Sequence, residues 1–245
     1  MKDKIYIEPA ASERKYRRLA ALGKELGVPV PQVFLEMEVK LPDGTVVHHH
    51  KQRSHSWVRN AYNLLFCQLA AVNLPDNTYA AGKLSLRRPS GTVAPVAEWN
   101  TSVGTPGFAI PSNLTVAGGG YLGVAGTATV GILVGSGLDA ESFNDYVLQT
   151  LIANGNGAGQ LDYALSNAYV VNWVLGTLTL SNTLVRYMNN NSAGDVAVNE
   201  VGLYIFLKTN DTAYLMCRDA LGATVTIPAM GQLKCTYVIS LVYPA

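Results

Sequence analysis

The sequence predicts a mainly β protein: an antiparallel, jelly-roll-like β-sandwich with one buried helix and an N-terminal arm followed by a helix. Small, polar and β-branched residues alternate between Val196 and Leu207 and again between Thr224 and Val242. Gly, Asn, Asp and Pro interrupt these runs. About eight to ten short strands follow one another from Val33 onward without a parallel-sheet pattern, and such spacing favours a sandwich over an α/β fold.

Two parts are expected along the chain. Residues 1–32 form the N-terminal arm and an amphipathic helix, and residues 33–245 form the sandwich domain. That domain carries an inserted helix at 57–72 and a Gly-rich loop at 100–127. Because a long loop without periodicity is uncommon inside a compact domain, we expect this loop to lie over an adjacent subunit.

The N-terminal arm and helix are the expected interaction elements. Ile5 and Ile7 point the same way on an extended segment, and Ser12 can cap a helix that is stopped at Gly27. The apolar face of this helix carries Tyr16, Leu19, Leu22 and Leu26. Its basic residues could meet nucleic acid or an acidic partner, but an exterior helix docked by its Leu stripe is the simpler interpretation.

A hairpin with a row of histidines follows. Val33–Lys40 and Val46–His50 alternate on either side of the turn Pro42–Thr45. All four histidines of the chain lie here or just beyond: His48, His49, His50 and His55. Neighbouring strand residues face opposite sides, so only His48 and His50 could share an ion. We expect no metal site, because no Cys or carboxylate stands at ligand spacing nearby.

A second helix and a Gly-rich loop come next. Ser56 precedes a helix from Trp57 to about Val72 that is apolar on most of its surface, so we expect it to be buried against a sheet or one end of the sandwich. The loop contains the spacing GxGxxG at Gly118, Gly120 and Gly123. It neither follows a clear strand nor opens a clear helix, so phosphate binding is not expected.

The middle of the chain predicts strands around one helix. Ser142 and Asp145 fit a capping box, and the apolar spacing that follows predicts a helix to about Ile152. Asp139, Glu141 and Asp145 cluster without a base or nucleophile, which indicates a capped, solvated turn. The strands expected around it are Leu84–Leu86, Thr129–Val134, Leu161–Tyr169, Val170–Trp173 and Leu175–Tyr187.

Composition excludes several classes of protein. Charged residues make up only 14%, which suits a protein whose surface is largely covered by neighbours. A net charge of +1 gives no general case for nucleic acid. Neither a signal peptide nor a membrane-spanning segment is expected. We also expect no small-molecule substrate and no cofactor. Three unspaced cysteines, Cys67, Cys217 and Cys235, indicate buried free thiols and folding in a reducing cytoplasm.

A series of motifs resembles a family of virion structural proteins from tailed bacteriophages. Its members carry a "VGTG"-like turn after a strand, then "N-E-V-G-L", then "R-D-x-L" and a final strand after "P-A-G". The matching segments run in the same order over roughly residues 33–243: SWVRNAYNLLF (56–66), GILVGSG (131–137), NDYVLQTLI (144–152), GQLDY (159–163), RYMNNNS (186–192), VNEVGLY (198–204) and RDALGATVTIPAMGQLKCTYVISL (218–241). Met230 departs from the pattern by lengthening the turn before the last strand. The resemblance implies a non-enzymatic virion component, made in the host cytoplasm.

Four residues of these motifs have structural roles that do not depend on the resemblance. Glu200 stands in an apolar strand, where an unpaired carboxylate would be costly. Arg186 and Arg218, at the edges of neighbouring strand candidates, are the available cations, so we expect Glu200 to pair with one of them and to fix strand register. Gly202 is expected where backbone or an aromatic ring approaches closely.

The leading functional hypothesis is self-assembly in a phage particle, with copies of itself and other virion proteins as partners. A symmetric oligomer in the tail or neck and a capsid decoration protein are the two positions that fit. A carbohydrate-binding module on a receptor-recognition tip is the alternative, with candidate aromatics Tyr121, Tyr169, Trp173 and Tyr187, although their strand patterns favour core packing. A hydrolase is the weakest reading, because no GxSxG elbow is present.

Overall fold

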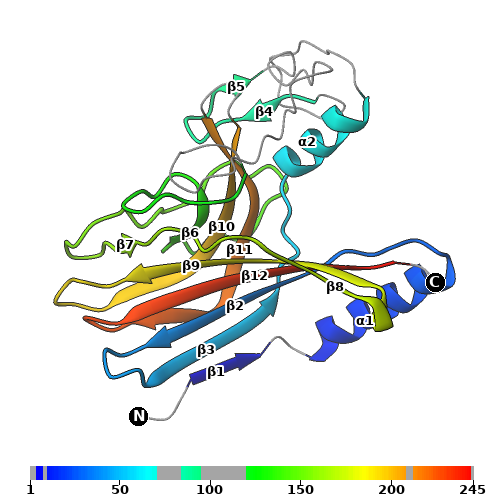
Figure 1. Ribbon diagram of the computed structural model, residues 1–245. Helices are drawn as coiled ribbons and strands as arrows, with labels where there is room; N and C mark the ends of the chain where they lie inside the picture. Colours follow the sequence, from blue (N-terminus) through cyan, green and yellow to red (C-terminus); the bar gives the residue numbers. More distant parts are fainter. Residues whose placement is uncertain (1–3, 8–9, 71–83, 95–119, 208–211, 244–245) are drawn as a thin grey trace.

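The protein is mainly β, an antiparallel β-sandwich with two helices, as the sequence predicts (Figure 1). The computed structural model describes residues 4–7, 10–70, 84–94, 120–207 and 212–243. Within these residues the sandwich consists of one large and one small sheet, and a short two-stranded pair accompanies it. Most of the Gly-rich loop expected at 100–127 lies outside the described residues. The side chain of Cys67 also lies outside the described part of the chain.

The large sheet has the strand order β1-β3-β2-β12-β9-β7, and β8 pairs with the other half of β9. The strands are β1 (Lys4–Ile7), β2 (Gln32–Lys40), β3 (Val46–Arg53), β7 (Asp162–Tyr163), β8 (Val170–Val174), β9 (Thr179–Asn189) and β12 (Gln232–Val242). β2 shows the alternation that places it here, since every second residue from Val33 to Val39 is buried. All pairings are antiparallel except the parallel pair of β1 with β3.

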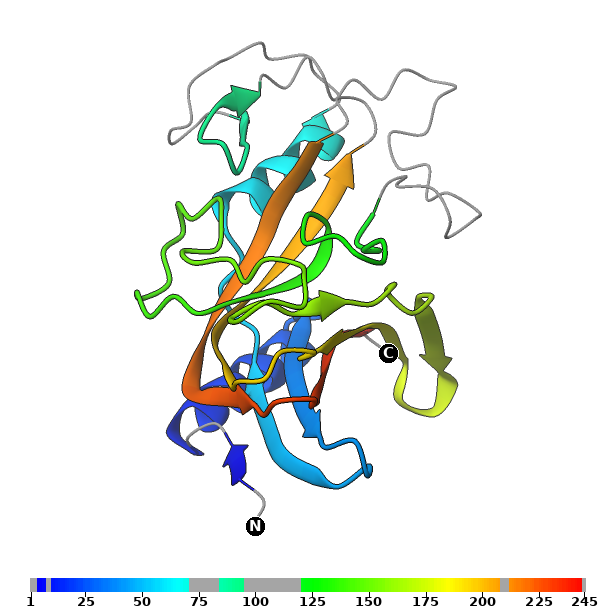
Figure 2. The ribbon, with the colours of Figure 1, turned by 90° about the vertical axis from the view of Figure 1, so that its left-hand side faces the viewer.

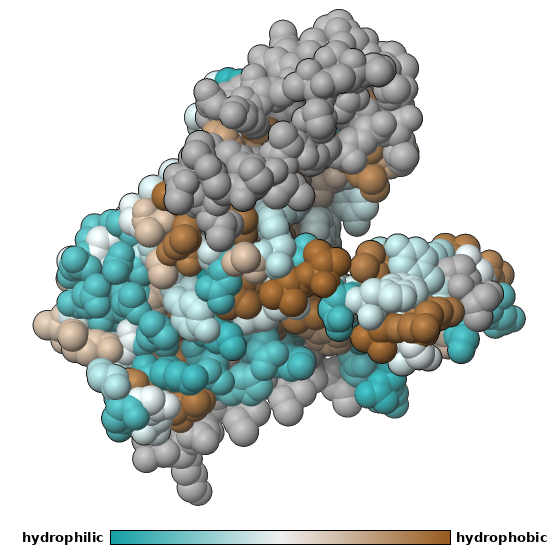
Figure 3. All heavy atoms as spheres, in the orientation of Figure 1, coloured by the Kyte–Doolittle hydropathy of each residue, from teal (hydrophilic) through white to brown (hydrophobic). Residues whose placement is uncertain are grey.

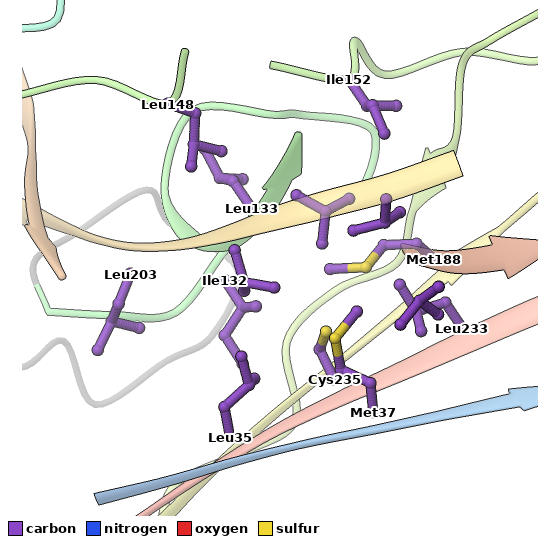
Figure 4. Packing of buried hydrophobic residues seen from close by; sticks show 14 of the residues in the cluster. Leu35, Met37, Ile132, Leu133, Leu148, Ile152, Met188, Leu203, Leu233 and Cys235 are labelled. Carbon is purple, nitrogen blue, oxygen red and sulfur yellow. The ribbon is translucent and has the colours of Figure 1, made fainter. Parts of the chain in front are cut away.

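The small sheet has the order β11-β10-β6, from β6 (Gly131–Gly135), β10 (Val196–Leu207) and β11 (Thr212–Ile227). β6 is buried throughout. Side chains of the two sheets meet in one core, with Leu35, Met37 and Cys235 from the large sheet facing Ile132 and Leu203 from the small one (Figure 4). The upper ends of β10 and β11 extend past this core to the pair β4 (Leu86–Arg87) and β5 (Val93–Ala94) (Figures 1 and 2).

Both helices form where the sequence predicts them, but neither is buried all round. α1 (Ala10–Glu25) lies beside the far end of the large sheet, and α2 (Arg59–Ala70) packs on β11 and β4 (Figure 1). On α2, Asn60 and Leu64 are buried, whereas Tyr62, Leu65 and Phe66 are about half exposed. The prediction of a buried helix is therefore wrong for the described residues, because α2 covers the sheet with one face only.

Two other predicted elements are also wrong. Residues 142–152 form turns and a single bridge at Leu151 in place of a helix. The amide groups that a helix would use internally instead donate to Glu200, as described below. The strand expected at 161–169 is limited to β7, and the chain then runs irregularly to β8 because Ser166 and Asn167 bond to other loops and strands.

Candidate functional site

A fully buried ion pair joins β10 to β11. Glu200 Oε2 accepts a hydrogen bond of 2.7 Å from Arg218 Nε, and both side chains are almost completely inaccessible. This confirms the expected pairing of Glu200 with one of the two arginines. The predicted position of these arginines at neighbouring strand edges is wrong, because Arg186 lies on β9 in the other sheet and Arg218 lies within β11.

The loop at 136–150 wraps this ion pair. The amides of Gly137 and Thr150 donate to Glu200 Oε1 at 3.2 and 2.8 Å, and that of Gln149 donates to Oε2 at 3.1 Å. Arg218 in turn donates to the carbonyl oxygens of Asp139 and Ala140. The other hydrogen bonds of the two charged groups thus go to this loop, which offsets the cost of burying them.

The predicted carboxylate cluster belongs to the same arrangement. Asp145 Oδ2 accepts from Arg218 Nη1 at 2.9 Å and from the amide of Ser142 at 2.9 Å, so it caps the turn as expected and also pairs with a buried cation. Glu141 accepts from the amide of Ala220. These carboxylates therefore have structural partners, and the interpretation of the cluster as simply solvated was incomplete.

Arg186 is buried, and no carboxylate of the described residues pairs with it. Its five N–H groups donate to five backbone carbonyl oxygens at 2.7–3.2 Å, those of Val124, Thr127, Val130, Ile132 and Ala164. Its guanidinium also lies 4.9 Å from the Tyr163 ring centroid. Burial lowers the pKa of Arg186 to about 10. A Cβ at Gly123 would overlap this guanidinium, so the glycine is the reason that the loop can close around it.

Gly202 lies at a close approach, as expected. A Cβ there would be 2.9 Å from Tyr204 Cε2 and 3.0 Å from Leu148 Cδ2. Asn190, in the RYMNNNS motif, has a structural role that sequence reasoning missed. Its side-chain amide donates to the carbonyl oxygens of Gly194, Ile227 and Pro228 and so holds the β9–β10 turn against the turn before β12.

Asp219 was also missed, although it follows Arg218 directly in the RDALG motif. It is completely buried, and its Oδ2 accepts from Tyr237 OH at 2.7 Å and from Cys217 Sγ at 3.3 Å. Oδ1 has no partner among the described residues. Burial raises the pKa of Asp219. The signal available in the sequence was a carboxylate at an inward position of an apolar strand.

The histidines and cysteines take structural positions. His48 and His50 are buried on the same side of β3 with ring centroids 6.5 Å apart, and His50 bonds to Gln52 at 2.8 Å. A carboxylate does lie nearby, since Glu36 on the next strand bonds to His49 at 2.7 Å, contrary to expectation. Among the described residues no group of three potential metal ligands gathers. Cys217 and Cys235 are buried free thiols, as predicted.

The N-terminal arm pairs with its own chain. Ile5 and Ile7 lie on β1, which runs parallel to β3, so this segment extends the sheet and is not a free arm. Helix α1 is fixed by a bidentate contact of Glu13 with Arg53 at 2.7 and 3.0 Å, beside Tyr16. The other apolar residues of its stripe, Leu19, Leu22 and Leu26, are 48–66% exposed. The stripe therefore does not dock the helix on the described part of its own domain.

An apolar groove of about 830 Å³ opens between α2 and the end of the large sheet. Its walls include Tyr16 of α1, Trp57 before α2, Leu65 of α2, Tyr121 and Val171 of β8. None of the lining residues within the described part of the chain is Asp, Glu, Lys or Arg. Tyr121 and Tyr169 pack here, where Tyr169 OH bonds to the Tyr121 amide. The sequence favours core packing for these two tyrosines. Both pack against the core while partly buried, and both also line the groove.

The hairpin formed by residues 170–183 projects from the body of the molecule (Figure 2). All five residues of β8 are exposed, and the turn at Leu175–Thr177 is exposed too. Apolar residues on one visible face gather along this end of the large sheet and on α1 (Figure 3). Trp173 is 45% exposed and meets Tyr243 edge-on at 5.4 Å, so the expectation of core packing is wrong for Trp173.

Comparisons with protein-family models, with curated proteins and with solved structures found no match. Neither described helix has the length and apolar character needed to cross a membrane.

Proposed function

We propose that this protein is a non-enzymatic structural component of a tailed-bacteriophage virion that assembles as a symmetric oligomer in the tail or neck. The proposal begins from the ordered series of motifs that resembles virion structural proteins. Several of those motifs have structural roles in the fold. Gly137 of GILVGSG, Glu200 of VNEVGLY and Arg218 of RDALG meet in one buried arrangement.

The observation that carries the assembly proposal is the exposed hairpin. Soluble monomers rarely expose a contiguous apolar patch of this kind, and such patches mark sites of protein association. Val170, Val171, Trp173, Val174 and Leu175 are 43–75% exposed within six consecutive residues. An edge strand with apolar side chains on both faces favours association by strand addition or insertion.

Light scattering coupled to size exclusion tests this function. A ring or another closed oligomer of the purified protein is the expected result, because heterologous contacts that close by rotation give defined copy numbers. Fitting the fold into density of intact particles then distinguishes the tail or neck from the capsid surface, where a decoration protein would lie. Absence of the protein from purified particles would overturn the proposal.

A carbohydrate-binding role is the second candidate, and a specific observation favours it. Trp173 and Tyr243 form an exposed aromatic pair of the kind on which sugar rings stack. Titration of the protein with a glycan array measures this directly. A monomer that binds a glycan, and loses that binding in Trp173→Ala, would replace the assembly proposal.

A further inference from the structure

We propose that the hairpin at residues 170–183 seats its tip in the apolar groove of a second copy of this chain, so that copies join head to tail. This inference rests on the proposed assembly function and names the surfaces that carry it. It commits to a second copy as the occupant of the groove. The absence of charge, the volume of the groove and the projection of the hairpin favour a second copy over another macromolecule.

The first observation is charge. Residues 163–185 hold no Asp, Glu, Lys, Arg or His, although they include a hairpin that projects from the body of the molecule (Figure 2). Among the described residues that line the groove, His55 is the one that can carry a charge near neutral pH. Two neutral surfaces can meet without leaving a charge unpaired and desolvated, which is the main electrostatic cost of forming an interface. A nucleic acid or a strongly charged protein has no complementary group to meet here.

The second observation is shape. The turn of the hairpin presents Val174 and Leu175 at its end, with Leu175 75% exposed. The groove volume of about 830 Å³ lies within the roughly 300–1,000 Å³ of clefts that hold compact apolar ligands. It can therefore enclose several large side chains of an inserted hairpin tip.

The third observation is that one copy can donate and accept at once. The groove lies between α2 and the far end of the large sheet, whereas the hairpin stands away from the body in the perpendicular view (Figures 1 and 2). Val171 and Asn182 at the base of the hairpin line the groove of their own copy, but Val174 and Leu175 at its tip do not, so the tip can enter the groove of another copy. The contact is heterologous when the same two copies do not exchange their tips. Such contacts repeat from copy to copy and close into rings when the rotation allows.

The base of the hairpin is built to hold a projecting tip. β9 is paired along its whole length with β12, and the Tyr243 amide donates to the Leu178 carbonyl oxygen at 2.8 Å. β8 has its outer edge unpaired in the described part of the chain, so its backbone groups also remain available to a neighbour. These bonds hold the hairpin in this conformation while its surface is still exposed to solvent.

Two variants test the contact by association. Val174→Glu and Leu175→Glu place a charge at the tip, so each should weaken self-association, measured by sedimentation, by roughly tenfold or more. The matched control is Leu138→Glu, which adds the same charge at a residue that is 81% exposed and belongs neither to the hairpin nor to the lining of the groove. An unchanged melting temperature of each variant separates loss of contact from loss of fold.

Cross-linking tests the partner surface. In a Cys67→Ser background, Thr177→Cys at the tip is mixed with Tyr62→Cys at the mouth of the groove, in separate chains. We expect a disulfide-linked heterodimer that is at least about tenfold more abundant than with Leu138→Cys in place of the tip cysteine. Because each chain carries one introduced thiol, any such bond joins two copies.

The outcomes separate this inference from the proposed function. An oligomer that persists in both tip variants, without the tip-to-groove cross-link, overturns the hairpin contact and leaves assembly intact. A protein that stays monomeric at every soluble concentration also overturns the contact. The proposed function is then tested separately, by fitting the fold into density of intact particles. A cross-link that forms only when other particle proteins are added contradicts a second copy as the occupant.

Discussion

Glu200, Arg218 and Arg186 show how buried charges are kept in this fold. Glu200 and Arg218 neutralise each other and use loop amides and carbonyls for their remaining bonds. Arg186 donates all five of its N–H groups to backbone carbonyl oxygens, and its guanidinium lies over the Tyr163 ring. Both arrangements satisfy the demand that buried polar groups be hydrogen-bonded, and both join segments far apart in the sequence.

Glu200→Gln should lower the free energy of unfolding by about 3 kcal/mol, because a neutral amide leaves a buried cation and places donors against donors. Chemical denaturation measures this loss. Glu38→Gln is the control, since Glu38 pairs with Lys40 at the surface and such pairs contribute about 0–1 kcal/mol. Equal stability of Glu200→Gln and wild type would show that the ion pair does not fix the two strands.

Asp219 should make stability depend on pH in the opposite sense to a salt-bridged carboxylate. Its pKa is raised by burial, so the folded state holds the proton more firmly than the unfolded state does. The contribution of Asp219 is therefore most favourable below its ordinary pKa of 3.8 and declines as pH rises through the raised value. Asp219→Asn does not titrate and should gain melting temperature relative to wild type as pH increases.

The measurement is a pair of melting curves over a pH series for Asp219→Asn and wild type. A constant difference between them at all pH values would mean that Asp219 keeps one protonation state throughout. Glu13, whose pKa the Arg53 hydrogen bond lowers to about 2, serves as the contrast, because its contribution is lost only as pH falls below 4.5.

At the scale of elements, two irregular loops enclose the buried charged groups. The segments at 121–132 and 136–150 enclose Arg186 and the Glu200–Arg218 pair, respectively. Glycine allows this enclosure in both loops. A Cβ at Gly137 would lie 2.6 Å from Glu200 Oε1, and one at Gly123 would lie 2.6 Å from the Val130 carbonyl oxygen.

Gly123→Ala should destabilise the protein by about 1–3 kcal/mol, since the added methyl group displaces either the guanidinium of Arg186 or the surrounding loop. Gly194→Ala is the matched control, with open space around the added Cβ and a backbone angle that alanine tolerates. Calorimetry of the two variants compares them. Similar melting temperatures would indicate that the loop moves aside at no cost.

Periodicity predicted the elements that are amphipathic over many residues, because an element with one apolar face has apolar residues at a regular spacing in the sequence. β2 is the example, and α1 shows the helical spacing although its apolar face is half exposed. β10, in contrast, is buried on both faces over most of its length. The helix expected after Ser142 was wrong, since its local signals compete with long-range bonds to Glu200 that no spacing reveals. The pairing of Glu200 with a cation followed from the cost of burial, but the choice of Arg218 depended on which strands share a sheet.

At the scale of the whole molecule, the hairpin at 170–183 has no charged residue, and the described lining of the groove has no Asp, Glu, Lys or Arg. The buried carboxylates and arginines lie within the sandwich, while the hairpin and the groove are neutral and apolar. A surface of this kind associates through the hydrophobic effect, with little contribution from ion pairs. The low total charge of the chain is consistent with a surface that is partly covered in use.

Self-association through these surfaces should therefore resist salt. We expect the dissociation constant to change by less than about twofold from low salt to about 1 M sodium chloride, because screening acts on charges that this contact lacks. Sulfate should strengthen the association. Dissociation at high sodium chloride, followed by light scattering, would point to the basic face of α1 as the contact instead.

The positions of two tryptophans have a consequence for measurement. Trp57 lines the groove and Trp173 lies on the hairpin, half exposed to solvent. Docking of one surface on the other removes both indole rings from water, so their fluorescence emission should move to shorter wavelength as subunits join. The wild-type chain thus carries its own optical reporter of assembly, and no label is needed to follow its kinetics.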